Sequence, residues 1–263
     1  GLSLMLSLTA VQISTFIATF WWPFCRIMGA FMVMPFLSST YIPVMVRILL
    51  AISISALVAP ILPPFPEVDA ISLKALFLGI EQLLVGFMLA LFLTIMIHVM
   101  TLVGAMMSMQ MGLAMAIMND PANGGSDPIL GQWFLLYGTL LFLALDGHLV
   151  ALGILVDSFR LWPIGMGVFD LPLMGLIGRI SWIFAAAFML ALPAVLAMLM
   201  VNVTFGVLSR AAPSLNVFAL GFPMSMLMGL LCVFFSFSGL PSRYSDLCLD
   251  ALSAMYQFIG GTQ

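Results

Sequence analysis

Long stretches without a single charged residue limit what this chain can fold into more than any other feature. They contain no aspartate, glutamate, lysine or arginine and cover residues 2–25, 48–66, 82–119, 180–209 and 211–242. A helix that crosses a bilayer needs about 20 mainly apolar residues, and most of these stretches reach that length. In lipid the backbone must satisfy its own hydrogen-bonding groups, so only helices or a closed barrel remain as candidates.

The pattern inside these stretches distinguishes the two candidates. A barrel strand shows alternating polarity over about 10 residues, whereas Leu83–Ile97 and Ile183–Val201 are apolar on every face. The composition agrees, because 64% of the residues are hydrophobic and 6% are charged, against about 25% charged in ordinary soluble domains. A soluble globular domain, a disordered chain and a nucleic-acid-binding protein are excluded. The sequence predicts an all-α integral membrane protein.

Proline, glycine and the rare charges divide the chain into about six hydrophobic regions, which we expect to form long, bent helical hairpins. In the first region we expect Pro23 to interrupt the helix. Membrane orientation stays open, because arginine and lysine are divided about three to four between alternate loops, and the positive-inside rule needs a clear excess. The expected regions are 2–34, 44–61, 73–107, 130–156, 173–208 and 215–240, followed by an amphipathic tail at 241–263.

Motifs that would indicate catalysis are missing from the sequence. It has no histidine pair at zinc-protease spacing, no serine-hydrolase elbow and no phosphate-binding loop. Asp146 and His148 could form an intramembrane proton relay or a polar packing contact, and we favour the packing contact. The three cysteines lie far apart and lack metal-ligand spacing. We therefore expect a protein without enzymatic activity, cofactor or metal.

A dense methionine cluster is the strongest signal in the residues themselves. The chain has 23 methionines, and six of them fall within Met106–Met118. Methionine is unbranched and polarizable, so it packs against irregular or changing shapes. The cluster could be a soft, buried helix end or a deformable seal around a conduit. A polar turn at 119–128 follows directly, and non-helical backbone at membrane depth must be buried or line a cavity, which favours the seal.

A few other residues indicate contacts between helices or pairing of charges. Ser225 and Gly229 are small residues at helical spacing, which would let two helices approach closely. Arg26 lies between two apolar stretches, where a charge is costly and is usually paired, and we expect it to snorkel to the membrane interface or to pair with another chain. Asp157 and Arg160 are three residues apart and could pair along one helix turn.

Three motifs carry a resemblance to a known family. They are Gln110–Ala114 followed by Asp120-Pro121, then Gly147–Leu149, and, most specifically, Ala212–Pro223, which reads APSLNVFALGFP. Together they resemble the FliR family of flagellar export proteins, over nearly the whole chain, in order and with similar spacing. The injectisome counterpart SctT is a close relative and stays open as an alternative, although Leu215–Pro223 is more similar to the flagellar proteins.

The resemblance implies a role and partners. FliR-like proteins form the core export gate of type III secretion with FliP and FliQ, in the bacterial inner membrane at the flagellar basal body. FlhB and FlhA homologues associate with this gate. A single FliR-like copy would help to form a conduit for unfolded flagellar proteins, surrounded by membrane lipid. By resemblance, residues 1–172 are a FliP-like part with a pore loop at 106–128, and residues 173–263 are a FliQ-like helical hairpin with a C-terminal tail.

The resemblance also implies roles for individual residues, and the implied plug agrees with the interpretation of the methionine cluster as a seal. A loop that would plug the closed gate consists of Gln110, Met111, Gly112, Leu113, Ala114, Met115, Ala116, Ile117, Met118, Asp120 and Pro121. A second set would serve the fold and subunit packing, namely Arg26, Asp157, Arg210, Pro213, Asn216, Phe218, Gly221, Phe222 and Pro223.

Other functions are less well supported by the residues. A secondary transporter would need internal repeats and broken helices around a substrate site near mid-membrane, but we find no convincing repeat and few polar residues. A purely structural subunit could nucleate assembly without contacting substrate. Asp146 occupies a position that is often asparagine in the resembling family, so we expect no charge-dependent role for it.

Overall fold

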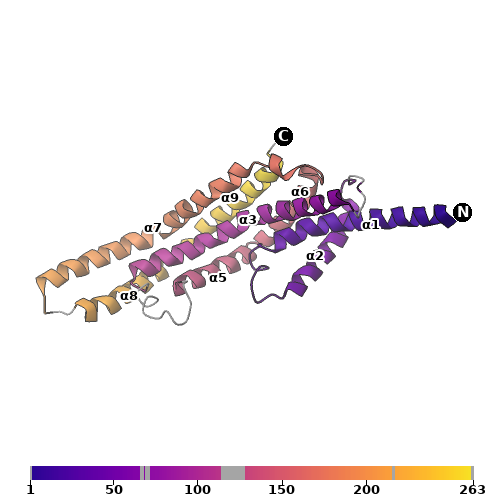
Figure 1. Ribbon diagram of the computed structural model, residues 1–263. Coiled ribbons are helices and arrows are strands. Elements are labelled where there is room, and N and C mark those ends of the chain that lie inside the picture. The colour runs from indigo at the N-terminus through magenta and orange to yellow at the C-terminus, as the bar shows by residue number, and fades with distance from the viewer. Residues whose placement is uncertain (1, 66–67, 69–71, 114–127, 215–216, 262–263) are drawn as a thin grey trace. The chain divides into compact units, whose positions relative to one another are not determined.

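The computed structural model describes residues 2–65, 68, 72–113, 128–214 and 217–261, and the regular secondary structure in these ranges is helical (Figure 1). The longest helices are α1 (Leu2–Phe31), α3 (Leu73–Gln110) and α7 (Leu173–Ala211). The shorter helices are α2 (Val44–Val58), α5 (Ile129–Ala144), α6 (Gly147–Leu161), α8 (Val217–Ser236) and α9 (Leu240–Gly260). Short 3-10 helices, η1 (Ala59–Ile61) and η3 (Val168–Asp170), lie between them.

Several helices are suited to cross a bilayer. In the described ranges, Val44–Ile61, Leu73–Gln110 and Leu173–Ala211 are each long and apolar enough to do so. Two pairs, α5 with α6 and α8 with α9, meet the same criterion jointly but bend by 69° and 64° at short breaks, which gives up to five spans. The predicted all-α integral membrane fold is confirmed.

Proline lies inside three of these helices without ending them. Pro23 is inside α1, Pro193 inside α7 and Pro223 inside α8. The predicted interruption of the first helix at Pro23 is therefore wrong. A proline removes one backbone donor, but ending the helix in an apolar setting would leave several more backbone groups without partners. The continuous helix therefore leaves fewer backbone groups without hydrogen-bond partners.

The fourth hydrophobic region is two helices, so the single helix predicted for 130–156 is wrong. α5 ends at Ala144 and α6 begins at Gly147. Between them Asp146 has a left-handed backbone with φ of 56°, which a short polar side chain tolerates better than most. The stretches 140–145 and 149–156 on either side of it are apolar, so hydropathy averaged over a helix-length window does not reveal this break.

The amphipathic tail predicted for 241–263 forms α9. Many of its apolar side chains are buried, including Ala251, Met255 and Ile259, which are at most 1% exposed, although Leu249 and Tyr256 are 64% and 45% exposed. The polar side chains of Asp250 and Ser253 face outward. This separation of faces is the pattern of a helix that packs on one side only.

The chain separates into two compact units that are interleaved in sequence. Unit 1 consists of Gly1–Thr94, Asp146–Arg179 and Asp250–Gln263, and unit 2 of Ile95–Leu145 and Ile180–Leu249. The helices α3, α7 and α9 each contribute to both units. This division follows compactness, whereas the FliP-like and FliQ-like parts were assigned by resemblance, so that assignment stays a prediction.

In unit 1, α1 and α3 approach each other at glycines. A Cβ atom on Gly29 would collide with the backbone of Leu83, and one on Gly86 would collide with the backbone of Arg26. Two backbones can come this close only where side chains are absent. The same crossing buries Phe31 completely.

In unit 2, glycines have the same effect between α3, α5 and α9. A Cβ atom on Gly104 of α3 would lie 2.6 Å from the Cα atom of Gly131 in α5. Gly138 of α5 faces the side chain of Met100 in α3 and the hydroxyl of Tyr244 in α9. Met100 and Tyr244 are fully buried, so small residues position the core of this unit.

Candidate functional site

The predicted plug loop begins with a well-formed helix end. α3 continues to Gln110, and Gly112 follows with φ of 74°. The N–H of Gly112 donates to the carbonyl of Met109 at 3.2 Å, and the N–H of Leu113 donates to the carbonyl of Ser108 at 3.0 Å. These two bonds around a left-handed glycine are a Schellman motif, which satisfies carbonyls that the helix end would leave without partners. The first residues of the segment predicted as a pore loop, 106–110, are therefore helical.

Met111 is fixed in this turn by a close fit to α8. Its side chain is 1% exposed, and it lies against Gly229, where a Cβ atom would collide with Met111 Cγ. The Sδ atom would lie 2.8 Å from that Cβ and the Cε atom 2.9 Å. Gly229 therefore provides the space that Met111 occupies. From the sequence, Gly229 is predicted only as a small residue for helix packing.

The next residue in the turn contacts the second family motif. A Cβ atom on Gly112 would come within 2.9 Å of the Phe222 ring. Glycine is thus required at 112 by the positive φ and by the adjacent ring. The structure brings the motif around Gln110 together with the Gly221-Phe222 part of the later motif, although they are about a hundred residues apart.

A polar connection joins the same turn to α7 and α8. The Asn202 side-chain amide donates to the backbone carbonyl of Gln110 at 3.3 Å. The Ser225 hydroxyl donates to the Asn202 side-chain oxygen, also at 3.3 Å. Both bonds are partly buried, where the loss of a partner costs more than in water. Asn202 was not predicted from the sequence, because a single asparagine in an apolar helix has no pattern around it.

These residues surround a groove of about 330 Å³ in unit 2. It is mainly apolar, and its polar groups are concentrated around the Asn202 amide. The lining residues are Met109, Gln110, Met111, Gly112, Asn202, Phe205, Gly206, Gly221, Phe222 and Ser225.

Unit 1 contains a second notable arrangement around a fully buried arginine. The Arg26 Nε donates to the Gln82 side-chain oxygen at 2.8 Å. Its Nη1 donates to the Ser158 carbonyl and its Nη2 to the Trp162 carbonyl, each at 2.9 Å. The guanidinium carbon lies 4.4 Å from the centre of the Phe159 ring. Arg26 therefore caps the carboxyl end of α6, where a cation is favourable. Its hydrogen-bond acceptors in the described residues are carbonyl, amide and hydroxyl oxygens.

Of the remaining predicted residues, Asp157, Arg210, Pro213 and Pro223 do not line the groove. Asp157 on α6, Arg210 in the last turn of α7, Pro213 in the following turn and Pro223 within α8 are exposed. Phe218 lies in the first turn of α8. The predicted positions outside the described residues are Ala114, Met115, Ala116, Ile117, Met118, Asp120, Pro121 and Asn216.

Two smaller expectations have clear outcomes. No ion pair joins Asp157 to Arg160 in the described part of the chain, whereas Arg179 of α7 pairs with Asp250 of α9 at 2.6 Å. The His148 ring packs edge-on against Phe36, with ring centres 6.3 Å apart. This contact agrees with a packing role for His148.

The fold and this site together define a helical integral membrane protein in which the turn after α3 packs against α8. Over the described residues, no three histidine, cysteine, aspartate or glutamate side chains are grouped to hold a metal ion. The family model described as bacterial export proteins, family 1, matches residues 17–251. The chain belongs to this family.

Curated relatives are similar along most of their length. The flagellar biosynthetic protein FliR of Escherichia coli K12 is 33% identical over 86% of this chain and 87% of its own. FliR of Pectobacterium carotovorum is 32% identical over the same shares. FliR of Bacillus subtilis is 25% identical over 90% of this chain and 94% of its own. The resemblance to the FliR family is confirmed.

Proposed function

We propose that this protein is a component of the flagellar type III export apparatus in the bacterial inner membrane. There it forms the core gate with FliP and FliQ, through which unfolded flagellar proteins pass. Membership in the bacterial export family and the similarity to FliR proteins support this role. The matched relatives named above are flagellar, which favours this assignment over the injectisome protein SctT.

Within this role, the methionine-rich loop after α3 seals the closed gate. The observation that carries this part is the packing of Met111 against Gly229, with the Gln110 carbonyl bonded to Asn202. These contacts hold the start of the loop against α7 and α8. A flexible thioether fits irregular spaces, so such a loop closes tightly and still adapts when a polypeptide displaces it.

Exposed apolar surface supports a role as one subunit of a larger assembly that includes FlhB and FlhA homologues. α7 carries an unusually long series of exposed apolar side chains, which need lipid or neighbouring helices to cover them. They include Ile177, Ile180, Phe184, Phe188, Met189, Leu199, Met200 and Val203.

Deletion of residues 111–118 tests the seal. In a motile host that lacks its own FliR, the full-length chain is expected to restore swimming when it is expressed with matching FliP and FliQ. The deletion variant is expected to collapse the membrane potential, measured with a voltage-sensitive dye, because ions pass the open gate. Unchanged ion permeability with normal levels of the variant would refute the seal, and failure of the full-length chain to restore export would refute the export role.

A further inference from the structure

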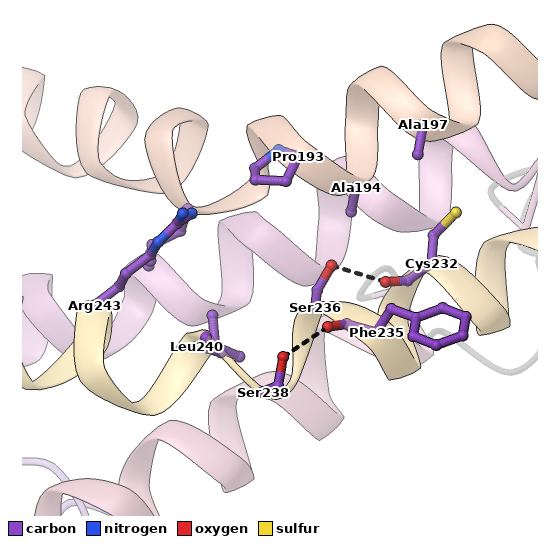
Figure 2. Close-up of a pocket in the computed structure, with 11 residues that line it drawn as sticks. Pro193, Ala194, Ala197, Cys232, Phe235, Ser236, Ser238, Leu240 and Arg243 are labelled. Carbon is purple, nitrogen blue, oxygen red and sulfur yellow. Dashed lines mark hydrogen bonds between the residues drawn. The ribbon is translucent and has the colours of Figure 1, made fainter.

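A second cavity in unit 2 lies between α7 and the break that separates α8 from α9 (Figure 2). Its volume is about 410 Å³, within the range of small-ligand sites. It is separate from the groove beside Met111, with which it shares no lining residue. The lining residues are Leu190, Pro193, Ala194, Ala197, Cys232, Phe235, Ser236, Ser238, Gly239, Leu240 and Arg243.

Two irregularities in neighbouring helices open this cavity. α8 and α9 bend by 64° at their break, so their side chains do not fill the corner. Opposite the break, Pro193 lies inside α7 and lacks the N–H that would bond back one turn. Small side chains at Ala194 and Ala197 leave the remaining space.

The chemistry of the lining limits what the cavity can bind. Most of the wall is hydrocarbon. The Ser236 hydroxyl already donates to the Cys232 carbonyl at 2.7 Å, and the Ser238 hydroxyl donates to the Phe235 carbonyl at 3.1 Å. Both hydroxyl hydrogens are thus engaged within α8 and the turn after it, so few polar groups of the lining besides Arg243 are free to donate to a ligand.

Arg243 is the cation of this cavity. Figure 2 shows its side chain extending from α9 toward the part of α7 that holds Pro193. Within the described ranges no side chain forms an ion pair with Arg243. Asp246, one turn further along α9, is exposed and does not line the cavity. The site therefore offers one positive group beside an apolar space, which suits an amphiphile with a single anionic group.

The surroundings favour a membrane lipid. α7 is a candidate span, and α8 with α9 is a candidate bent span. Beside the cavity Phe234 and Phe235 are 70% and 71% exposed, and Met189 is 67% exposed. Basic pockets between membrane helices bind anionic head groups. We propose that this cavity binds an anionic phospholipid, with the phosphate at the Arg243 guanidinium and an acyl chain against Pro193, Ala197 and Phe235. This inference does not depend on the export role.

Native mass spectrometry of the full-length chain, with any subunits that co-purify, tests the proposal. The detergent-solubilised protein is incubated with phosphatidylglycerol or with phosphatidylcholine of identical acyl chains. A single arginine at a membrane surface contributes about a fivefold preference for anionic lipid. We expect the wild-type chain to retain phosphatidylglycerol by about that factor over phosphatidylcholine.

Four variants separate the cavity from general charge. Arg243→Gln is expected to abolish the preference without affecting phosphatidylcholine, and Ala197→Leu is expected to reduce retention of both lipids by filling the cavity. Arg160→Gln removes an exposed charge from α6 and is expected to change nothing. Each variant must elute from gel filtration at the same volume as the wild-type protein. If Arg243→Gln does not fold, Arg243→Lys takes its place. This variant keeps the charge and is expected to retain part of the preference for phosphatidylglycerol.

Several results would overturn the proposal. One is equal retention of both lipids by the wild-type chain. Another is a loss of the phosphatidylglycerol preference in Arg160→Gln as large as that in Arg243→Gln. A third is an unchanged preference in Arg243→Gln. Loss of a co-purifying subunit from Arg243→Gln and Ala197→Leu with unchanged lipid retention would also overturn it, because a protein helix would then occupy the cavity.

Discussion

Met111 occupies the space beside Gly229 that a Cβ atom at position 229 would need. The Sδ atom of Met111 would be 2.8 Å from that Cβ, and the Met111 side chain is 1% exposed. The fit between the turn after α3 and helix α8 therefore depends on a missing side chain. Both positions can be changed separately, which makes this contact the most direct test of how the loop is held.

Gly229→Ala is expected to displace Met111. Overpacking of this kind destabilises by about 1–3 kcal/mol, which is partly offset by the roughly 0.5–1 kcal/mol advantage of alanine within a helix. We expect a lower thermal unfolding midpoint of the purified protein and, if the loop seals the gate, a larger ion leak in cells. The control is Gly153→Ala, because no atom lies within 4 Å of a Cβ built there. A midpoint for Gly229→Ala as high as that of the control would contradict the close fit.

Met111→Ala and Met109→Ala form a matched pair of substitutions two residues apart. Met111 is 1% exposed and Met109 is 68% exposed. Truncation of a buried methionine typically costs about 2–5 kcal/mol, whereas exposed changes usually stay within about 0.5 kcal/mol. Denaturant unfolding should therefore show a marked loss of stability for Met111→Ala only. Equal losses would mean that Met111 is not the buried anchor of the turn.

Asn202→Ala is expected to release the Gln110 carbonyl. A hydrogen bond of this kind contributes about 0.5–1.5 kcal/mol. Because Ser225 acts through Asn202, adding Ser225→Ala to Asn202→Ala should have little further effect on the free energy of unfolding. Thr204→Ala is the control, since Thr204 is exposed and bonds only to its own helix at Met200. Full additivity of the two substitutions would show that Asn202 and Ser225 act independently.

Arg26→Met is expected to be strongly destabilising. It leaves the Gln82 side-chain oxygen and the Trp162 carbonyl without the Arg26 donor, while the Ser158 carbonyl still accepts from the Trp162 N–H. A buried acceptor that loses its donor costs about 1–3 kcal/mol, and Arg26→Met affects two of them at once, so we expect little folded protein in the membrane fraction. Arg160→Met, at an exposed position on the same α6 helix, should accumulate normally. Equal membrane-fraction yields of the two variants would rule out a structural role for Arg26.

The sequence alone predicted much of the helical organisation. Uncharged runs such as 82–119 and 180–209 are too long and too apolar for anything but membrane helices, and the regions predicted for 73–107 and 173–208 match α3 and α7. The amphipathic pattern of α9 was also visible in the sequence. These features depend on the hydropathy of single residues and on fixed helical spacing, both of which are local.

Only the tertiary structure decided where helices break and which distant residues contact one another. Pro23 does not interrupt α1. A break that was not predicted occurs at Asp146, between α5 and α6. The expectation that Arg26 snorkels to the interface or pairs with another chain is wrong, because Arg26 is fully buried and its partners lie on α3 and at the end of α6 of the same chain. Met111 belongs to a methionine cluster that is obvious in the sequence, but the residue it packs against, Gly229, lies more than a hundred residues away. Such contacts depend on how one helix is rotated and shifted against another, and hydropathy along a single chain does not specify that register.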